Sequence, residues 1–279
     1  MEIRFFPPHP LLAPYVAHLW TVESETAFLP GDLKAILPNG RMKLVFPYKG
    51  ALFNGPAGRA YETNAENSLW VLGMADKPWV VDHDGAFGTL AVEFHPGAAY
   101  KFFALPLGDL QNQVVPAPDV FGINARDWES QLAEESTPAG KSARLQRLLL
   151  ELLGNERASD SLVDHAVALI RSRKGLITIG ELTQRMGYSQ RYLALKFEAR
   201  VGVGPKTLAE ILRFQNQFAF LTRLGGPPGR LDFDDGYYDQ AHFTKEFKRF
   251  AGLPPAQYSR ARNEFFNLFQ QTSDSYKTG

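Results

Sequence analysis

The sequence contains no cysteine among its 279 residues. This absence excludes disulfide bonds, thiol nucleophiles and zinc sites with cysteine ligands, and it is typical of proteins in a reducing compartment. No stretch of 18 consecutive apolar residues is present, so we expect no membrane-spanning helix. The first residues carry no basic stretch followed by a long apolar run, so we also expect no signal peptide. Together these absences predict a cytoplasmic protein without membrane contact.

The net charge is zero, but the charges are unevenly distributed along the chain. From residue 156 to the end there are 18 Lys and Arg against 13 Asp and Glu, which gives this part a charge of +5. The rest of the chain therefore carries a charge of −5. A basic C-terminal part joined to an acidic N-terminal part favours an anionic partner for the basic part.

Residues 1 to about 125 have the composition of a β-rich domain. Turn-forming Gly, Pro, Asn and Asp separate four runs with the composition of β-strands, which are MKLVFPY (42–48), SLWVLGM (68–74), PWVVD (78–82) and GTLAVEF (88–94). Several short strands at this spacing predict an antiparallel barrel or sandwich.

The pattern becomes helical after this region. The segment KSARLQRLLLELL (141–153) places Leu145, Leu148, Leu149 and Leu152 on one stripe of an amphipathic helix. The sequence leaves two interpretations of this stripe open. It packs on its own domain, or it pairs with the same stripe of a second subunit.

From about residue 160 the sequence contains an internal repeat with a spacing of 50 residues. The matched positions are Ser189, Gln190, Leu193, Phe197, Gly202 and Pro205 in the first copy, and Asp239, Gln240, Phe243, Phe247, Gly252 and Pro255 in the second. Each copy predicts a helix with a Ser or Asp cap, two core residues one turn apart, and a glycine and a proline that end it. A long helix over about 205–224 is expected to join the copies.

The first copy follows the segment ELTQRMGYSQ, in which a tight turn at Gly187 separates two helices. Helix, glycine-containing turn and capped helix together form the helix-turn-helix pattern. The face opposite the core residues is small, polar or basic, which suits a helix that lies in the major groove of DNA. Two such units could enter successive major grooves, and the flanking basic residues Lys196, Arg200, Lys248 and Arg249 are candidate phosphate contacts.

These stretches resemble the AraC/XylS type of transcriptional regulator. GYYDQAHFTKEFKRFAGLPPAQY (236–258) is similar to the C-terminal signature of that family, and IGELTQRMGYSQRYLALKFEARVGVGP (179–205) resembles its first helix-turn-helix. The stretches FFPPHPLLAPYVAHLW (5–20), ILPNGRMKLVF (36–46) and FHPGAAYKFFALPLGDL (94–110) resemble an uncharacterised β-rich sensor domain that some of these regulators carry.

The resemblance implies an α+β multidomain fold. A β-rich, barrel-like N-terminal domain would precede an all-α C-terminal domain with two helix-turn-helix units joined by a long helix. We expect a sensor or dimerisation domain at 1–135, a linker with an amphipathic helix at 136–159, the double helix-turn-helix domain at 160–270 and a flexible tail at 271–279.

The resemblance also places the base-contacting positions of the family on this chain. They are Arg191, Ala194 and Leu195 in the first unit, and Gln240, Ala241, Thr244 and Lys245 in the second. The family usually has Arg at the position of Leu195, and a leucine there would instead make an apolar contact with a thymine methyl group. Two prolines and three acids occupy residues 227–235, so the resemblance leaves open whether the second unit is competent to bind DNA.

The function that follows is a sequence-specific DNA-binding regulator of transcription that is not an enzyme and has no cofactor. Its expected partner is double-stranded promoter DNA, and RNA polymerase is a second partner if the protein is an activator. The N-terminal domain would bind a small-molecule effector or join two subunits into a homodimer.

A different class of function has a separate sequence basis. The segment VEFHPG places Glu93 and His95 on one face of a strand, with His83 nearby in sequence, and barrels can bind metals through such residues. The alternative is therefore a metal-dependent small-molecule enzyme or ligand-binding barrel whose helical domain no longer binds DNA. A third interpretation is that the helical domain binds a protein partner.

Overall fold

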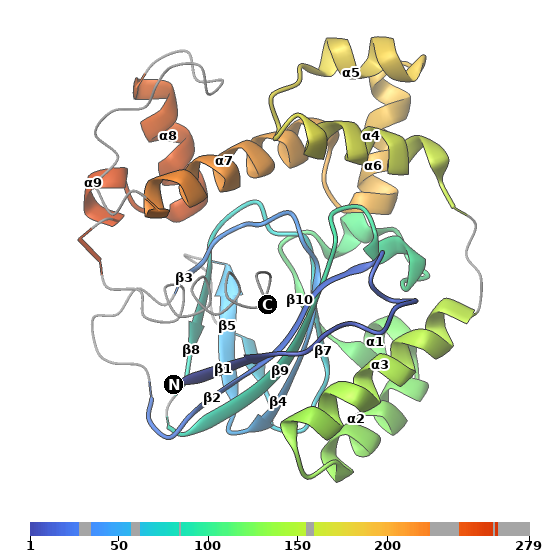
Figure 1. Ribbon diagram of the computed structural model, residues 1–279, viewed down its shortest axis with the longest axis vertical. Helices are drawn as coiled ribbons and strands as arrows, with labels where there is room; N and C mark the ends of the chain where they lie inside the picture. Colours follow the sequence, from blue (N-terminus) through green and yellow to red (C-terminus); the bar gives the residue numbers. More distant parts are fainter. Residues whose placement is uncertain are drawn as a thin grey trace.

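The computed structural model describes residues 1–27, 35–56, 62–83, 85–154, 159–223, 240–258 and 260–261. Figure 1 shows a β-rich domain in the lower half of the view and a layer of helices above it. Within the described ranges, no helix combines the length and apolar character that crossing a membrane requires.

Two antiparallel sheets form the β-rich domain. The first has the strand order β1 (Glu2–Phe5), β2 (Val16–Ser24), β9 (Phe87–Phe94), β4 (Lys43–Lys49), β7 (Trp70–Leu72) and β10 (Val114–Pro116). The second has the order β3 (Ala35–Ile36), β8 (Trp79–Asp82), β5 (Leu52–Pro56) and β6 (Glu62–Asn64). Each of the four runs with strand composition thus lies at one strand, β4, β7, β8 or β9, and the β-rich architecture is confirmed.

Strand β9 is the centre of this domain, and all eight of its residues are buried. One face, which includes Phe87 and Ala91, packs in a cluster with Trp79 and Val81 of the second sheet. Because successive side chains of a strand point to opposite faces, Leu90 and the other even-numbered residues face the other way. That second face is covered by helices, which explains why the strand reads as a nearly continuous apolar run.

Helices of different lengths cover the outer face of the first sheet. They are η1 (Ala99–Lys101), η2 (Leu107–Leu110), α1 (Ala117–Phe121), α2 (Asn124–Glu134) and α3 (Pro138–Gly154). Leu145, Leu148 and Leu149 of α3 are buried in the core of this domain, and α3 contacts β2 and β9. The leucine stripe therefore packs on its own chain, which decides between the two interpretations of the sequence.

The C-terminal part consists of α4 (Ser161–Ser172), α5 (Ile179–Met186), α6 (Gln190–Val201), α7 (Pro205–Arg223), α8 (Gln240–Ala251) and α9 (Pro255–Tyr258). Helix α7 is the expected long connecting helix, and Figure 1 shows it running between α6 and α8. The α+β fold class is confirmed. The expected domain boundaries stay a prediction, and residues 227–235 and the tail 271–279 lie outside the described residues.

The two parts meet along a seam where backbone and side chains approach closely. A Cβ atom added at Gly97, which precedes η1, would lie 2.8 Å from Cγ2 of Val167 in α4. Gly97 also has a φ of +75°, a left-handed backbone conformation that is unfavourable for residues other than glycine. Two independent constraints therefore favour glycine at this position.

We predict that Gly97→Ala lowers stability more than a left-handed backbone alone would require. Gly187→Ala is the matched control, because Gly187 has a φ of +72° and no atom within 4 Å of an added Cβ. The control should lose about 1–2 kcal/mol of unfolding free energy from backbone strain, and Gly97→Ala should lose about 1–3 kcal/mol more from overpacking. Urea unfolding measures both variants, and equal losses would show that the seam is not tightly packed at Gly97.

Candidate nucleic-acid interface

The first helix-turn-helix is built from α5, a left-handed turn at Gly187, and α6. The Thr178 hydroxyl caps α5 by accepting a hydrogen bond from the Glu181 amide, and the Ser189 hydroxyl caps α6 in the same way from the Tyr192 amide. Gly187 has φ +72° and ψ +19°, the conformation that ends a helix and redirects the chain. The cap expected at Ser189 is therefore present.

The core anchors fix which face of each helix is exposed. Leu193 and Phe197 are fully buried in α6, and Phe243 and Phe247 are buried at the equivalent positions of α8. Both helices have 12 residues, and both are followed by a glycine in the left-handed conformation. The repeat is therefore present in the structure. Asp239, the expected cap of α8, lies outside the described residues.

The base-reading candidates of α6 lie on its exposed side. Arg191 is exposed, Ala194 is half-buried, and the side chain of Leu195 is 57% exposed. The rings of Tyr188 and Tyr192 stack at 5.2 Å beside them and are 50% and 42% exposed. The sequence analysis missed these two tyrosines, although their spacing of four residues across the helix start is a signal for neighbouring side chains.

The candidates of α8 are also accessible. Gln240, Ala241 and Lys245 are exposed, and Thr244 is half-buried. Phe243 and Phe247 point the opposite way, into an aromatic cluster with Phe214 and Phe218 of α7. The structure thus places the seven base-reading candidates on the exposed or half-buried sides of α6 and α8.

Most of the basic residues expected to contact phosphates form ion pairs with carboxylates of this chain. Lys196 Nζ lies 3.0 Å from the Asp160 carboxylate, and Arg200 Nε lies 3.9 Å from the same oxygen. Arg249 pairs with Glu210 at 2.7 Å, whereas Lys248 is exposed. Three of the four candidate phosphate contacts are therefore bound to acidic side chains of this chain.

Asp160 joins three parts of the molecule at one point. Its carboxylate caps α4 by accepting from the Val163 amide, and it also pairs with Lys196 of α6. Its backbone amide donates to the Tyr100 hydroxyl of the β-rich domain, and that hydroxyl donates to Asp164. The hydrogen bond from Lys196 to Asp160 raises the pKa of the Lys196 ammonium above its ordinary value.

Comparison with known proteins agrees with this geometry. Residues 182–261, from within α5 to beyond α9, match a family described as a helix-turn-helix domain. The chain carries an AraC-type helix-turn-helix domain. Residues 4–116 match a second family, described as a domain of unknown function (DUF6597). The AraC-type domain makes this chain a DNA-binding protein of transcription regulation.

Several solved structures are similar to this chain at low sequence identity. ToxT from Vibrio cholerae is 11% identical, with 86% of this chain and 98% of ToxT covered and a TM-score of 0.47. ToxT with a bound unsaturated fatty acid is also 11% identical, with 86% and 93% covered and a TM-score of 0.44. The AraC-like activator CuxR is 14% identical, with 78% and 86% covered and a TM-score of 0.25. No curated protein matches the chain.

One position of the repeat forms an ion pair in both units of the AraC-type domain, but the residue at that position is basic in the first unit and acidic in the second. Lys196 in α6 corresponds to Glu246 in α8, 50 residues later. Lys196 pairs with Asp160, and Glu246 pairs with Arg213 of α7. In both units this position therefore ties the recognition helix to an earlier helix of the domain.

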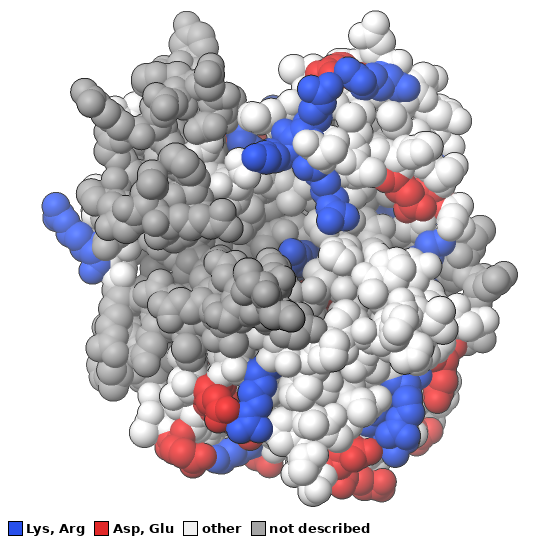
Figure 2. All heavy atoms as spheres, viewed as in Figure 1, with Lys and Arg blue, Asp and Glu red and all other residues white. Residues whose placement is uncertain are grey.

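The charge distribution differs between the two halves of the visible face. Figure 2 shows Lys and Arg side chains gathered over the part of the helical half near α4, α5 and α6, with few acidic side chains among them. Over the β-rich domain, basic and acidic side chains are interleaved. This arrangement agrees with the charge asymmetry of the sequence and suits a polyanion at the helical half.

Glu93 and His83, two of the residues considered for a metal site, have partners within the protein. The Glu93 side chain is buried, and its carboxylate lies 3.0 Å from Arg41 Nη1, 3.1 Å from His18 Nδ1 and 3.3 Å from Lys43 Nζ. His83 stacks on Phe87. In the part of the chain that the structure describes, no group of three or more His, Cys, Asp or Glu side chains could hold a metal ion.

The basic side chains around Glu93 determine its charge. Burial by itself raises the pKa of the Glu93 carboxyl, but Lys43, His18 and Arg41 together hold that pKa well below its ordinary value of 4.5. Because β2 and β4 pair with β9 on either side, His18 and Lys43 are both direct cross-strand neighbours of Glu93. Glu93 therefore compensates basic groups inside the β-rich domain.

We predict that Glu93→Gln costs about 3–5 kcal/mol of unfolding free energy at neutral pH, because it leaves Lys43 and Arg41 without their carboxylate. A carboxyl whose pKa is lowered on folding stabilises the protein above its unfolded pKa, and this contribution is lost as the pH falls through the folded value. The difference between wild type and variant should therefore shrink below pH 4.5. Urea unfolding across this range measures it.

Glu25→Gln is the matched control, because Glu25 is 84% exposed and pairs with Lys49 at the surface. It should change stability by less than about 1 kcal/mol. Equal effects of the two substitutions, or a Glu93→Gln effect that does not depend on pH, would contradict the role of Glu93.

Proposed function

We propose that the protein reads promoter DNA with α6 and α8 and that its N-terminal domain controls this binding. The observation that carries the proposal is the repeat of two capped, 12-residue helices with identical anchor positions and accessible outer faces. A pair of such helices on one connecting helix suits two successive major grooves, which lie about 34 Å apart on one side of DNA.

In α6, Arg191 is the candidate for direct base readout, because a guanidinium forms two hydrogen bonds with the major-groove edge of guanine. Leu195 would contact a thymine methyl group, and the Ala194 side chain is small enough for close approach. The stacked rings of Tyr188 and Tyr192 flank this face, and their hydroxyl groups can donate to phosphates.

In α8, Gln240 and Lys245 supply polar groups, and Ala241 and Thr244 supply small side chains. Glutamine forms two hydrogen bonds with adenine, and lysine donates to guanine. Lys248 follows at the exposed side as a phosphate contact. The second unit therefore has its own candidate base-contacting side chains, which supports a DNA target with two half-sites.

The β-rich domain is a proposed regulator of this binding. It contacts the C-terminal half of α6 through η1 and η2, and the Tyr100 hydroxyl is hydrogen-bonded to the backbone of Asp160. A change in this domain would reach Lys196 through two contacts. A homodimer would need a surface other than the stripe of α3, which is buried within the chain. RNA polymerase is a further proposed partner if the protein is an activator.

Selection from a randomised DNA pool at two salt concentrations tests the function. An enriched motif with two half-sites about one helical turn apart would support docking of both units. A single half-site would limit sequence readout to one unit. Absence of any enriched motif at either salt concentration would contradict sequence-specific binding.

We predict that Arg191→Ala weakens binding to the selected DNA by about 1–3 kcal/mol and relaxes the preference at one base pair. The matched control is Arg147→Ala, because Arg147 is an exposed arginine of α3 in the other half of the molecule. The control should leave affinity and sequence preference unchanged. Fluorescence anisotropy and a second selection measure both, and an unchanged preference in Arg191→Ala would remove Arg191 from the base-reading set.

We predict that Asp160→Asn strengthens DNA binding, because Lys196 and Arg200 no longer have to leave an ion pair to reach phosphate. Asparagine caps helices as well as aspartate does, so α4 should stay folded. An ion pair of this kind is worth up to about 1 kcal/mol, so the affinity should rise by up to about fivefold. The slope of log affinity against log salt concentration should also become steeper, by the amount expected for up to about two additional phosphate contacts. Equal affinity and equal salt dependence would show that neither residue contacts DNA.

A further inference from the structure

The outer face of α6 carries an apolar stripe formed by Tyr188, Tyr192 and Leu195. All three are exposed, and they are half of the six large apolar side chains that are exposed within the described ranges. Their spacing of four and then three residues places neighbouring side chains on one side of a helix. Tyr188 precedes α6, but its ring stacks on the Tyr192 ring at 5.2 Å and an angle of 25°. The stripe therefore begins just before the helix and continues along it.

This stripe lies on the side of α6 that faces DNA. It is opposite the buried anchors Leu193 and Phe197, and the exposed Arg191 lies next to it. Exposed apolar residues of a soluble protein are normally scattered singly, whereas a group of them marks a binding surface. Because the recognition helix of a helix-turn-helix unit lies in the major groove, the exposed side of α6 meets base edges. The position of the stripe within this interface favours DNA as its occupant.

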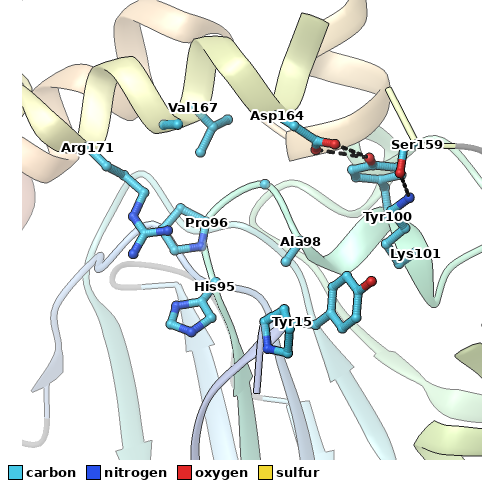
Figure 3. Close-up of a pocket in the computed structure, with 13 residues that line it drawn as sticks. Tyr15, His95, Pro96, Ala98, Tyr100, Lys101, Ser159, Asp164, Val167 and Arg171 are labelled. Carbon is cyan, nitrogen blue, oxygen red and sulfur yellow. Dashed lines mark hydrogen bonds between the residues drawn. The ribbon is translucent and has the colours of Figure 1, made fainter. Parts of the chain in front are cut away.

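The flank of α6 beside the stripe is bound to its own chain. The Arg200 guanidinium lies over the Tyr100 ring, 5.3 Å from the ring centroid, and Lys196 pairs with Asp160. Figure 3 shows the Tyr100 hydroxyl directed at the Asp164 carboxylate, to which it donates a hydrogen bond. This flank thus faces the β-rich domain and the start of α4, and the stripe is the exposed side of the helix.

The chemistry of the stripe matches one feature of the major groove. The base pairs present different hydrogen-bonding groups there, and thymine adds an apolar C5-methyl group. A leucine side chain and two tyrosine rings offer mainly apolar contact, so they discriminate by the presence of this methyl group. Each tyrosine hydroxyl can still donate to a phosphate, because it lies at the polar tip of an otherwise apolar ring.

The length of the stripe sets the length of the DNA that it covers. From Tyr188 to Leu195 the chain advances about 10 Å, at a helical rise of about 1.5 Å per residue. Successive base pairs are about 3.4 Å apart along the DNA axis, so the stripe spans about three of them.

The equivalent positions of the second unit have a different character. The repeat places His242 at the position of Tyr192 and Lys245 at the position of Leu195, and both are exposed. Imidazole and ammonium groups form hydrogen bonds, which a methyl group cannot accept or donate. Contact with methyl groups is therefore expected of the first unit and not of the second, which makes the second half-site an internal comparison.

We propose that the first unit recognises the C5-methyl groups of a run of about two to three successive thymines in its half-site. Leu195 and the rings of Tyr188 and Tyr192 lie against these methyl groups. The proposal deepens the proposed function and rests on it, because it names the DNA that α6 contacts.

Selection by the full chain from two randomised DNA pools tests this recognition. One pool contains thymine, and the other is copied in each round with deoxyuridine in its place, which removes the methyl group and keeps the base pairing. The thymine pool should enrich a motif with a thymine run in one half-site, and the uracil pool should enrich at most the other half-site.

The outcomes separate this proposal from the proposed function. The same complete motif from both pools, or a motif without a thymine run, would overturn methyl recognition and leave sequence-specific binding intact. Absence of any motif from the thymine pool would contradict sequence-specific binding and methyl recognition together.

Fluorescence anisotropy on the enriched site measures the methyl groups one at a time. Deoxyuridine in place of one thymine of the run should weaken binding about fourfold, the factor expected for one buried methyl group. The same replacement in the other half-site should leave the affinity unchanged. Equal effects in the two half-sites would overturn the proposal.

Substitutions in the stripe identify the side chains that cover the methyl groups. Leu195→Ala and Tyr192→Ala should each lower the ratio of affinities for the thymine and uracil sites by about fourfold for each methyl group covered. Tyr192→Phe keeps the ring and should keep the ratio, even where loss of the hydroxyl weakens binding to both sites. These side chains are exposed, so the substitutions should not disturb folding.

Ile123→Ala is the matched control, because Ile123 is an exposed apolar residue next to α2, in the other half of the molecule. It should leave both affinities unchanged. An unchanged ratio in Leu195→Ala and Tyr192→Ala would overturn the proposal and leave a protein partner as the occupant of the stripe.

Discussion

Asp160 is the residue at which the β-rich domain, the start of α4 and the helix α6 are joined. It caps α4, and it holds Lys196 of the first recognition helix at 3.0 Å. The amide of the same residue is fixed by the Tyr100 hydroxyl of the β-rich domain. A single residue therefore links the start of the helical half to both α6 and the β-rich domain. Contacts that involve charged groups and are partly shielded from water are well suited to such a role.

The β-rich domain also contacts the second unit. Its central strand is buried on both faces, and the Glu93 carboxylate pairs with Arg41 of the loop before β4. That same loop contacts α7, since Gln215 Nε2 donates to the Pro38 carbonyl oxygen and Leu37 joins the aromatic cluster of α7 and α8. Both recognition helices are thus positioned by one folded body.

The helices of the DNA-binding half could be predicted from the sequence because their signals are local. Cap, two anchors, glycine and proline recur at fixed spacing, and each acts on atoms within a turn or two of itself. The base-reading candidates came from the resemblance to the AraC/XylS family. The partners of Lys196, Arg200 and Arg249 could not be predicted in this way. Asp160 lies 36 residues before Lys196, and Glu210 lies 39 residues before Arg249.

The sequence by itself determined the two recognition helices, their buried and exposed faces and the β-rich character of the first half, because burial periodicity and helix ends are short-range properties. Only the tertiary structure decided that the leucine stripe of α3 packs on β2 and β9 rather than on a second subunit. It also decided that Glu93 meets His18, 75 residues away. The physical reason is the same in each case. Strand register and helix docking bring distant charges together, and these depend on the packing of the whole chain.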